Sequence, residues 1–298
     1  MTHASPASRP ARLAVGAVGA GRVGAVLLAA LARAGHRPVA VTAVSRASRR
    51  RAEELVPAAR ILPVDEVAGQ VDLLLLAVPD DELSGLVGGL ASADVVRAGT
   101  LVAHTSGAHG AGLLEPLTRH GALPMALHPV MTFTGTEVDL QRLAGACFGV
   151  TAPEELRLAA EALVIEMGAD PVWIDEAARP LYHAALAIGA NQLVTLVAQA
   201  QDMLGQAGVE SPSRMLGPLL GAALDNALRR GDGALTGPVA RGDAGTVRAH
   251  LATLSTPESV AAYVAMSRLT AVRALAAGVL TPDRAEALLD VLAAGGQP

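Results

Sequence analysis

Gly19-Ala20-Gly21-Arg22-Val23-Gly24 stands between an apolar run, 13–18, that is typical of a strand and an Ala- and Leu-rich run, 23–34, that is typical of a helix. In a dinucleotide-binding turn the first glycine allows a tight bend, the second leaves bare backbone for a pyrophosphate, and the third lets the helix pack on the strand. The helix N-terminus adds unpaired N–H groups and the positive end of its dipole. We therefore predict that a nucleotide cofactor is bound by Gly19, Gly21, Arg22, Val23 and Gly24.

Short apolar runs alternate with helical patterns as far as about residue 175, and the rest of the chain is rich in Ala and Leu at helical spacing. Strands separated by helices predict crossover connections and a parallel sheet. We predict the α/β class, with a doubly wound, mostly parallel Rossmann sheet followed by an all-helical domain. The predicted division is a flexible tail over 1–10, a cofactor-binding Rossmann domain over 11–175 and a helical substrate and dimerisation domain over 176–298. The predicted strands are 13–18, 39–44, 71–78, 100–104, 123–128, 146–151 and 171–174.

The composition narrows the classes of partner. The 298 residues are 51% apolar, carry a formal net charge of −5 and include no lysine. With no dense basic run besides Arg49 to Arg51, nucleic acid is disfavoured as a partner. The single cysteine, Cys147, cannot form an internal disulfide, and its apolar neighbours predict a buried, inert thiol and a reducing cytoplasm. The absence of lysine excludes Schiff-base chemistry and a lysine acid.

The end of the second predicted strand decides the cofactor. An acidic residue there bonds the ribose 2′-hydroxyl of NAD, but this chain reads Ser45-Arg46. Arg46 with Arg49 or Arg50 suits the 2′-phosphate of NADP, because a guanidinium offers phosphate two N–H donors. We therefore predict NADP(H), with Ser45, Arg46 and Arg49 beside the adenosine ribose. The alternative is that the arginines from 49 to 51 form the solvated face of a helix that also carries two glutamates.

Further motifs accompany the glycine turn. They are Ala77-Val78-Pro79-Asp80, His104-Thr105-Ser106-Gly107, His128-Pro129-Val130-Met131-Thr132-Phe133, Tyr182-His183-Ala184-Ala185, Ala190-Asn191 and Thr236-Gly237-Pro238-Val239-Ala240-Arg241-Gly242-Asp243. With them the chain resembles the 6-phosphogluconate-dehydrogenase-like oxidoreductases, and within that superfamily an uncharacterised family that pairs a Rossmann-like domain with a C-terminal domain of unknown function of the DUF2520 type. The resemblance implies that Val78 and Pro79 lie under the nicotinamide ribose, that Thr105, Ser106 and Gly107 face the substrate, and that the helical half forms a homodimer.

Hydride transfer to a carbonyl or imine needs a proton donor near the nicotinamide. In the β-hydroxyacid dehydrogenases of that superfamily a lysine four residues before an asparagine supplies it; here Asn191 matches the asparagine and Ala187 takes the place of the lysine. Because an imidazole ordinarily titrates near neutral pH, His183, one turn earlier, is the predicted acid, with Asn191 and Ser106 as the other catalytic candidates. Because eight helical residues rise by about 12 Å, His183 and Asn191 are not expected to hold the same atom. The alternative is a satisfied histidine at a domain junction.

Two further residues are predicted to touch the substrate together with Thr105 and Gly107. His128 precedes a proline at a strand end, so its ring is expected to point into the cleft, and His104 has a similar position. Arg241, in a loop rich in Gly and Pro, is a candidate clamp for a substrate carboxylate, or else it pairs with Asp243 and caps a helix. No metal-ligand spacing links the histidines, so no metal site is predicted.

These expectations combine into an NADP(H)-dependent oxidoreductase for a small carboxylate-bearing carbonyl or alcohol, with a ketopantoate-like 2-oxo acid as the first substrate class. The missing lysine keeps two alternatives open. One is an imine reductase similar to the pyrroline-carboxylate reductases, because an iminium ion needs less help from an acid. The other is a regulator or scaffold that binds NADP without turnover. We expect a cytoplasmic protein with a small-molecule substrate and neither nucleic acid nor a membrane as partner.

Overall fold

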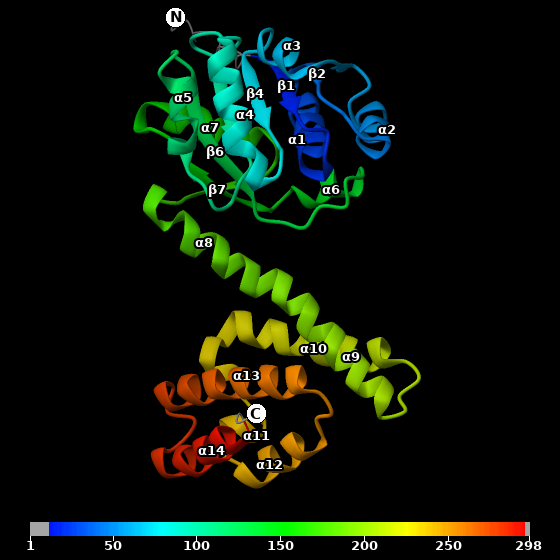
Figure 1. Ribbon diagram of the computed structural model, residues 1–298, viewed down its shortest axis with the longest axis vertical. Coiled ribbons are helices and arrows are strands. Elements are labelled where there is room, and N and C mark those ends of the chain that lie inside the picture. Colours follow the sequence, from blue (N-terminus) through cyan, green and yellow to red (C-terminus); the bar gives the residue numbers. More distant parts are fainter. Residues whose placement is uncertain (1–11, 296–298) are drawn as a thin grey trace, which may run out of the picture. The chain divides into compact units, whose positions relative to one another are not determined.

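The computed structural model describes residues 12–295, so the predicted tail over 1–10 lies outside the described residues. The described chain forms two compact units, 12–191 and 192–295. The first is built on one sheet and the second consists of helices (Figure 1). The predicted α/β class, the mostly parallel sheet and the helical second part are confirmed. Helix α8 (Arg179–Leu186), which follows the predicted boundary at 175, falls within the first unit.

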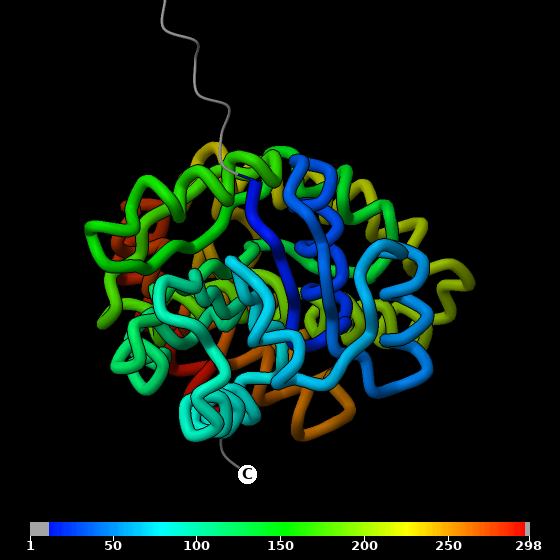
Figure 2. Tube along the Cα trace, turned by 90° about the horizontal axis from the view of Figure 1, so that it is seen from above, coloured from blue at the N-terminus to red at the C-terminus, as the bar shows by residue number. Residues whose placement is uncertain are grey.

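The sheet has eight strands in the order β3-β2-β1-β4-β5-β6-β7-β8. Neighbours pair in parallel except β6 and β7, which are antiparallel. Figure 2 shows β1 and β2 side by side in blue. The strands are β1 (Ala14–Val18), β2 (Arg37–Val41), β3 (Arg60–Ile61), β4 (Leu73–Leu76), β5 (Leu101–His104), β6 (Leu123–Pro129), β7 (Cys147–Thr151) and β8 (Asp170–Trp173). Since β1, β2, β4, β5 and β6 are parallel, the turns that follow them lie along one edge of the sheet.

Helices cover both faces of this sheet because the strands are apolar on both sides. Leu73 and Leu75 of β4 belong to a core with α1 (Arg22–Arg33) and α7 (Arg157–Glu166), whereas Leu74 and Leu76 face α4 (Asp80–Ala93) and its neighbours. The alternation follows the two-residue period of a strand. The other helices of the first unit are α2 (Arg46–Leu55), α3 (Val64–Ala68), η1 (Ala111–Leu114), α5 (Glu115–Thr118), α6 (Val138–Arg142), η2 (Glu154–Leu156) and η3 (Glu176–Ala178).

The second unit has an uneven core. Its buried apolar residues come almost entirely from the last four helices and the turn before α14. In α9 and α10 only Leu216 is buried. The helices are α9 (Leu193–Gln206), α10 (Pro212–Arg230), η5 (Gly231–Ala234), α11 (Gly237–Ala240), α12 (Ala244–Thr253), α13 (Pro257–Ala276) and α14 (Pro282–Gly295).

Helix α8 continues through a π-helical stretch, η4 (Ala187–Gln192), into α9. The whole helical stretch Glu176–Gln206 has a mean hydropathy of 1.4 in its most apolar window, so its length and composition would suffice to cross a membrane. Length and composition alone do not distinguish a membrane span from a helix that another protein surface covers. The stretch nevertheless begins with a buried arginine fixed to the sheet, as described below.

Candidate functional site

The glycine turn after β1 has the geometry that a pyrophosphate needs. Gly19 has a φ of 102°, and a Cβ on Gly19 or Gly24 would overlap the carbonyl oxygens of Ala77 and Gly19 respectively. At Gly21 the nearest atom to such a Cβ is the Ala77 oxygen at 4.0 Å, so this position stays open. Gly19 N–H donates to Thr42 Oγ1 at 2.7 Å, which ties the turn to the end of β2. The residues fit a dinucleotide phosphate at the N-terminus of α1.

Val78 and Pro79 lie next to this turn, at the end of β4. The Val78 side chain lies 3.6 Å from the position of a Cβ on Gly19, and Pro79 is the N-cap residue of α4. The predicted neighbours of the cofactor, Gly19 to Gly24 and Val78-Pro79, are therefore together at one sheet edge. Their contact with a nicotinamide cofactor stays a prediction.

The residues predicted to select NADP occupy the start of α2. Ser45 caps that helix through a hydrogen bond from Ser48 N–H at 3.1 Å, while Arg46 and Arg49 are exposed. The first turn of α2 contains no acidic residue, so it is electrostatically open to an anion. Arg50 pairs with Glu54, as the solvated-face alternative expects.

Arg51 has a role that the sequence did not indicate. Its Nη1 donates to the Ala20 carbonyl at 2.9 Å, so it holds the glycine turn rather than facing solvent. The loop after β6 also reaches this point, because a Cβ on Gly135 would lie 2.5 Å from Arg51 Nε and 3.2 Å from Arg22 Cα. Arg22 therefore lies between the turn and this loop.

The turn after β5 carries the predicted Thr105, Ser106 and Gly107. His104 is fully buried, and it supports this turn instead of pointing into the cleft: Nε2 bonds the Gly110 carbonyl at 2.9 Å and Nδ1 accepts Ser106 N–H at 3.3 Å. Burial lowers the pKa of His104 to about 4, and the charge of Arg179 acts in the same direction. The expectation for His104 was wrong because its ring faces inward from the last position of β5. Ser106 Oγ accepts His109 N–H at 3.3 Å.

Gly107 lies against two imidazole rings. A Cβ at this position would lie 2.6 Å from His183 Cδ2 and 2.9 Å from His128 Nε2. The two rings are perpendicular, with centroids 5.8 Å apart. The structure thus brings together the predicted Gly107, His128 and His183, and it explains why position 107 has no side chain.

Tyr182 completes this group. Its hydroxyl lies 2.8 Å from His128 Nδ1, and the two rings meet edge to face at 5.6 Å. A Cβ on Gly149 of β7 would overlap the Tyr182 hydroxyl, so the neighbouring strand is also shaped for it. The pKa of His128 is lowered to about 4, chiefly by burial and then by the charges of His183, Arg179 and His104. The carboxylate of Asp80 opposes this shift. His128 is therefore neutral at pH 7.

Arg179 fastens helix α8 to the sheet. Its side chain is fully buried, and its guanidinium donates to four neutral oxygens: Thr151 Oγ1 at 2.8 Å, Gly149 O at 2.9 Å, Ala126 O at 3.1 Å and Ser106 O at 3.2 Å. These acceptors belong to β6, β7 and the turn after β5. One side chain thus sets where Tyr182 and His183, three and four residues further along α8, meet His128.

A cavity of about 200 Å³ opens beside these rings. Asn191 and Ala187 line it together with His183, although straight α-helical geometry separates His183 from Asn191. They line it from α8 and from η4, which is a π-helical stretch, and the prediction that they do not hold the same atom stays a prediction. The lining residues are His128, Pro129, Val130, Met131, Thr132, His183, Leu186, Ala187, Ala190 and Asn191.

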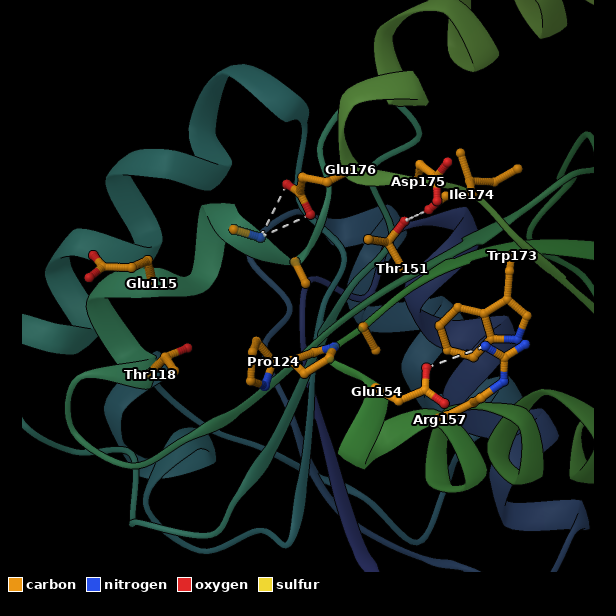
Figure 3. Close-up of a pocket in the computed structure, with 14 residues that line it drawn as sticks. Glu115, Thr118, Pro124, Thr151, Glu154, Arg157, Trp173, Ile174, Asp175 and Glu176 are labelled. Atoms are coloured by element: carbon orange, nitrogen blue, oxygen red, sulfur yellow. Dashed lines mark hydrogen bonds and ion pairs between the residues drawn. The ribbon is translucent and has the colours of Figure 1, made fainter.

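A second cavity, of about 510 Å³, lies toward the opposite end of β6 (Figure 3). Thr151 connects it with the buried arginine, since its hydroxyl accepts from Arg179 and donates to Ile174 O at 2.5 Å. Glu176 accepts a hydrogen bond from Gly112 N–H at 3.2 Å, and Arg157 stacks on Trp173 at 4.4 Å. These contacts hold η3, and so the start of α8, against the sheet.

Two other predictions concern single residues. Cys147 is exposed, so the predicted buried thiol was wrong: it is the first residue of β7, and its neighbour Phe148 takes the core position. Arg241 is an exposed residue of the second unit, at the C-cap of α11. Asp243 caps α12 by accepting from Thr246 N–H at 3.0 Å, and the alternative that Arg241 pairs with Asp243 stays open. The clamping role of Arg241 stays a prediction.

Reasoning from the sequence missed Arg179 and gave Tyr182 no role. A buried arginine had no local signal, because its acceptors lie 28 to 73 residues away. Tyr182 offered a weak signal, because it is one of only two tyrosines and stands beside the predicted acid.

Known structures share this architecture. One is a Bacteroides fragilis protein provisionally named an NADP oxidoreductase, with a TM-score of 0.74 and 24% identity; the match covers 87% of this chain and 98% of that one. A Thermotoga maritima protein matches with a TM-score of 0.65 and 19% identity, over 88% of this chain and 98% of that one. A pyrroline-5-carboxylate reductase from Coxiella burnetii matches with a TM-score of 0.55 and 17% identity, over 93% of this chain and 99% of that one. At these identities the likeness shows the fold. No curated protein matches the chain in sequence.

Two family models match in succession. A Rossmann-like domain covers residues 1–129, and a domain of unknown function, DUF2520, covers residues 146–270. Together they span most of the chain in the order that the glycine turn and the later motifs predict. The protein therefore belongs to the family that joins a Rossmann-like domain to a C-terminal DUF2520 domain.

Proposed function

We propose that the protein is an NADP(H)-dependent oxidoreductase that transfers hydride to or from a small carboxylate-bearing carbonyl or alcohol, with a ketopantoate-like 2-oxo acid as the first substrate class. The observation that carries the proposal is the turn after β1. It is closed to side chains at Gly19 and Gly24, open at Gly21, and lies along the same sheet edge as the cavity beside His128 and His183. Similar folds include proteins named as NADP oxidoreductase and pyrroline-5-carboxylate reductase.

The choice of NADP(H) rests on α2. Exposed Arg46 and Arg49 and a helix start without acidic residues form a surface that favours a 2′-phosphate over a bare hydroxyl. When bound, the cofactor would supply or accept the hydride at its nicotinamide ring. The chain would hold the diphosphate at Gly21 and Arg22 and the nicotinamide side near Val78 and Pro79.

The small cavity would hold the reacting part of the substrate. Its imidazole and amide groups, from His128, His183 and Asn191, can donate hydrogen bonds to a carbonyl oxygen. Ser106 and Thr105 lie on the adjoining turn and would contact the substrate from the β5 side. A guanidinium can bind a carboxylate with two N–H donors, and Arg241 is the candidate for this role.

Fluorescence titration of the purified protein with NADPH and with NADH tests the cofactor assignment. We expect saturable binding of both, with NADPH at least tenfold tighter. Equal affinities would overturn the NADP preference, and binding of neither would overturn the oxidoreductase function itself. Replacing His183 and Asn191 by alanine then separates enzyme from regulator: turnover should fall while NADPH affinity stays unchanged.

One observation favours an imine as the second candidate substrate class. No arginine is among the residues that line the small cavity, and the chain has no lysine, so a fixed positive charge is missing there. An iminium carbon is already polarised and needs less acid assistance than a ketone. Consumption of NADPH with 1-pyrroline-5-carboxylate but not with ketopantoate would select this class.

The apolar face of the second unit would be covered by a second copy of the chain. Ten large apolar side chains of α9, α10 and α13 are exposed by 39% to 79%, while α11 to α14 bury a core of their own. A twofold axis lets the same face cover itself, which is how most homodimers form. The residues are Leu193, Val194, Leu196, Met215, Leu219, Leu224, Leu228, Met266, Leu269 and Val272. Light scattering is expected to give twice the chain mass at micromolar concentration; a monomer, or partition into lipid vesicles, would contradict the dimer.

A further inference from the structure

Among residues 12–295 no carboxylate forms an ion pair with Arg179, and Glu176 stabilises its charge only from farther away. All four of its hydrogen bonds go to neutral oxygens, and the first group whose negative form would stabilise it is Tyr182, whose ring lies 5.7 Å from the guanidinium carbon. A buried cation normally requires a compensating charge. An ionised Tyr182 would therefore stabilise the Arg179 charge more than the distant Glu176 does.

The contact between Tyr182 and His128 fits either tautomer of the imidazole, and the surroundings of Tyr182 favour one of them. The Tyr182 hydroxyl is half-buried and needs an acceptor for its own proton. Among residues 12–295 the acceptor within its reach is His128 Nδ1, at 2.8 Å. A neutral imidazole that accepts at Nδ1 carries its proton on Nε2. That nitrogen packs beside the bare backbone of Gly107, and the His128 side chain lines the small cavity.

We propose that Tyr182 and His128 form a proton relay that protonates the reacting oxygen or nitrogen of the substrate, and that Arg179 stabilises the tyrosinate which the relay leaves behind. The proposal rests on the proposed function. In the reducing direction the substrate carbon gains the hydride, and the substrate heteroatom takes the proton of His128 Nε2. Nδ1 takes the Tyr182 proton, so the imidazole stays neutral and changes tautomer. The relay resets when Nδ1 returns its proton to the tyrosinate and Nε2 takes a proton from solvent, so that each reduction consumes one solvent proton.

The relay supplies the acid that the chain lacks at position 187. A neutral imidazole is a weak acid when it must become imidazolate, but it can pass a proton when a second donor refills it. Burial raises the pKa of Tyr182, and the nearby Arg179 opposes that rise. In this scheme His128 is the catalytic residue that touches substrate, whereas Arg179 is a positioning residue.

The second unit holds a matched control. Tyr263 Oη lies 2.8 Å from His250 Nδ1, with ring planes at 88°, which repeats the geometry of Tyr182 and His128. Within residues 12–295 no buried arginine stacks on the Tyr263 ring, and His250 is exposed. Tyr263→Phe therefore removes one phenol hydroxyl of the same type without touching the relay.

The first experiment reads the tautomer in the protein without added ligands. The protein is labelled with ¹⁵N at its histidines, and the His128 signals are identified by their loss in His128→Gln. Long-range ¹H–¹⁵N spectra at pH 7 are expected to show a neutral His128 with its proton on Nε2. Tyr182→Phe should mix the two tautomers, while Tyr263→Phe leaves the His128 signals unchanged. An imidazolium at pH 7, or a proton fixed on Nδ1, would overturn the relay.

The second experiment measures the ionisation of Tyr182 by absorbance near 295 nm in the Tyr263→Phe background, where it is the only tyrosine. Arg179→Met is expected to lower its acid dissociation constant at least tenfold, and Arg179→Lys to restore most of the loss. If the methionine variant does not fold, the lysine variant and Tyr182→Phe carry the test. An unchanged ionisation in a folded Arg179→Met protein would remove the role of the arginine charge.

The third experiment uses NADPH with ketopantoate or 1-pyrroline-5-carboxylate. Tyr182→Phe is expected to lower kcat by 100-fold or more at an unchanged KM for NADPH, and Tyr263→Phe to leave both unchanged. Retained kcat in Tyr182→Phe would overturn the relay even if the tautomer is correct. Failure of NADPH to bind would overturn the proposed function instead, and the tautomer measurement would still stand.

Discussion

The two tyrosine–histidine pairs have nearly the same internal geometry, yet only one lies in a built site. His128 and Tyr182 are held between two strands, a glycine turn and a buried arginine, and they border a cavity. His250 and Tyr263 bond one another on the exposed side of α12 and α13. The surroundings of a tyrosine–histidine pair, rather than the distance between its two atoms, therefore decide whether it can act on a bound ligand. It also follows the division of the chain, since the first unit completes its core and the second leaves α9 and α10 uncovered.

Removing Arg179 should have the largest effect on this comparison. Arg179→Met leaves four buried acceptors without a donor, so we expect the free energy of unfolding of the first unit to fall by about 3 kcal/mol or more. Chemical denaturation followed by the single tryptophan, Trp173, measures it, because this residue lies in the first unit.

Arg268 provides the control in the second unit. Its hydrogen bond to the Leu292 carbonyl, at 3.2 Å, is half-buried, so Arg268→Met should cost the second unit about 1 kcal/mol. Far-UV circular dichroism measures this loss, because Trp173 reports on the first unit. Equal losses in the two variants would mean that the four bonds of Arg179 contribute no more than one ordinary hydrogen bond.

Acid should unfold the first unit through His104. Its folded pKa of about 4 lies below the ordinary 6.5, so between these values the unfolded chain binds a proton that the folded chain does not. Stability is therefore complete above pH 6.5 and falls as the pH drops toward 4, by about 3 kcal/mol for this residue. His128 contributes in the same direction.

Unfolding curves at pH 7 and pH 4.5 check this expectation. His104→Gln keeps a donor and an acceptor at the turn and cannot titrate, so its stability should depend less on pH than that of the wild type. An identical dependence would show that the buried histidine is not the source of the acid sensitivity.

Local patterns explain how much could be predicted from the sequence. The glycine turn and the alternating strands are local, so β1, α1 and the cofactor edge followed from residues 13–34 and their periodicity. The meeting of His183 with His128 depends on Arg179, whose acceptors are spread over the turn after β5, β6 and β7. The approach of Asn191 depends on a π-helix that no composition rule indicates, and Cys147 follows its place at a strand end rather than its apolar neighbours.

Charged substitutions on α10 should break the second unit's pairing and leave the first unit intact. Burying one exposed leucine side chain at an interface contributes about 2 kcal/mol. Leu224→Glu and Leu228→Glu each remove this contribution and place a charge on the face. We expect both to shift the protein toward the monomer in sedimentation or light scattering. Leu158→Glu is the matched control, because Leu158 of α7 is 80% exposed in the first unit. A dimer that survives both α10 changes would place the interface elsewhere.

The smallest expected effect comes from an exposed arginine, Arg46, in contrast to the buried Arg179. Arg46→Ala removes an exposed side chain at the start of α2, where solvent screens its charge and no fold contact depends on it. We expect the Kd for NADPH to rise about tenfold, which is about 1.4 kcal/mol, while the Kd for NADH and the unfolding curve stay the same. Arg50→Ala is the control, because Arg50 pairs with Glu54 on the same helix. Equal losses of NADPH and NADH affinity in Arg46→Ala would mean that this arginine does not recognise the 2′-phosphate, and the preference for NADP would then need another cation.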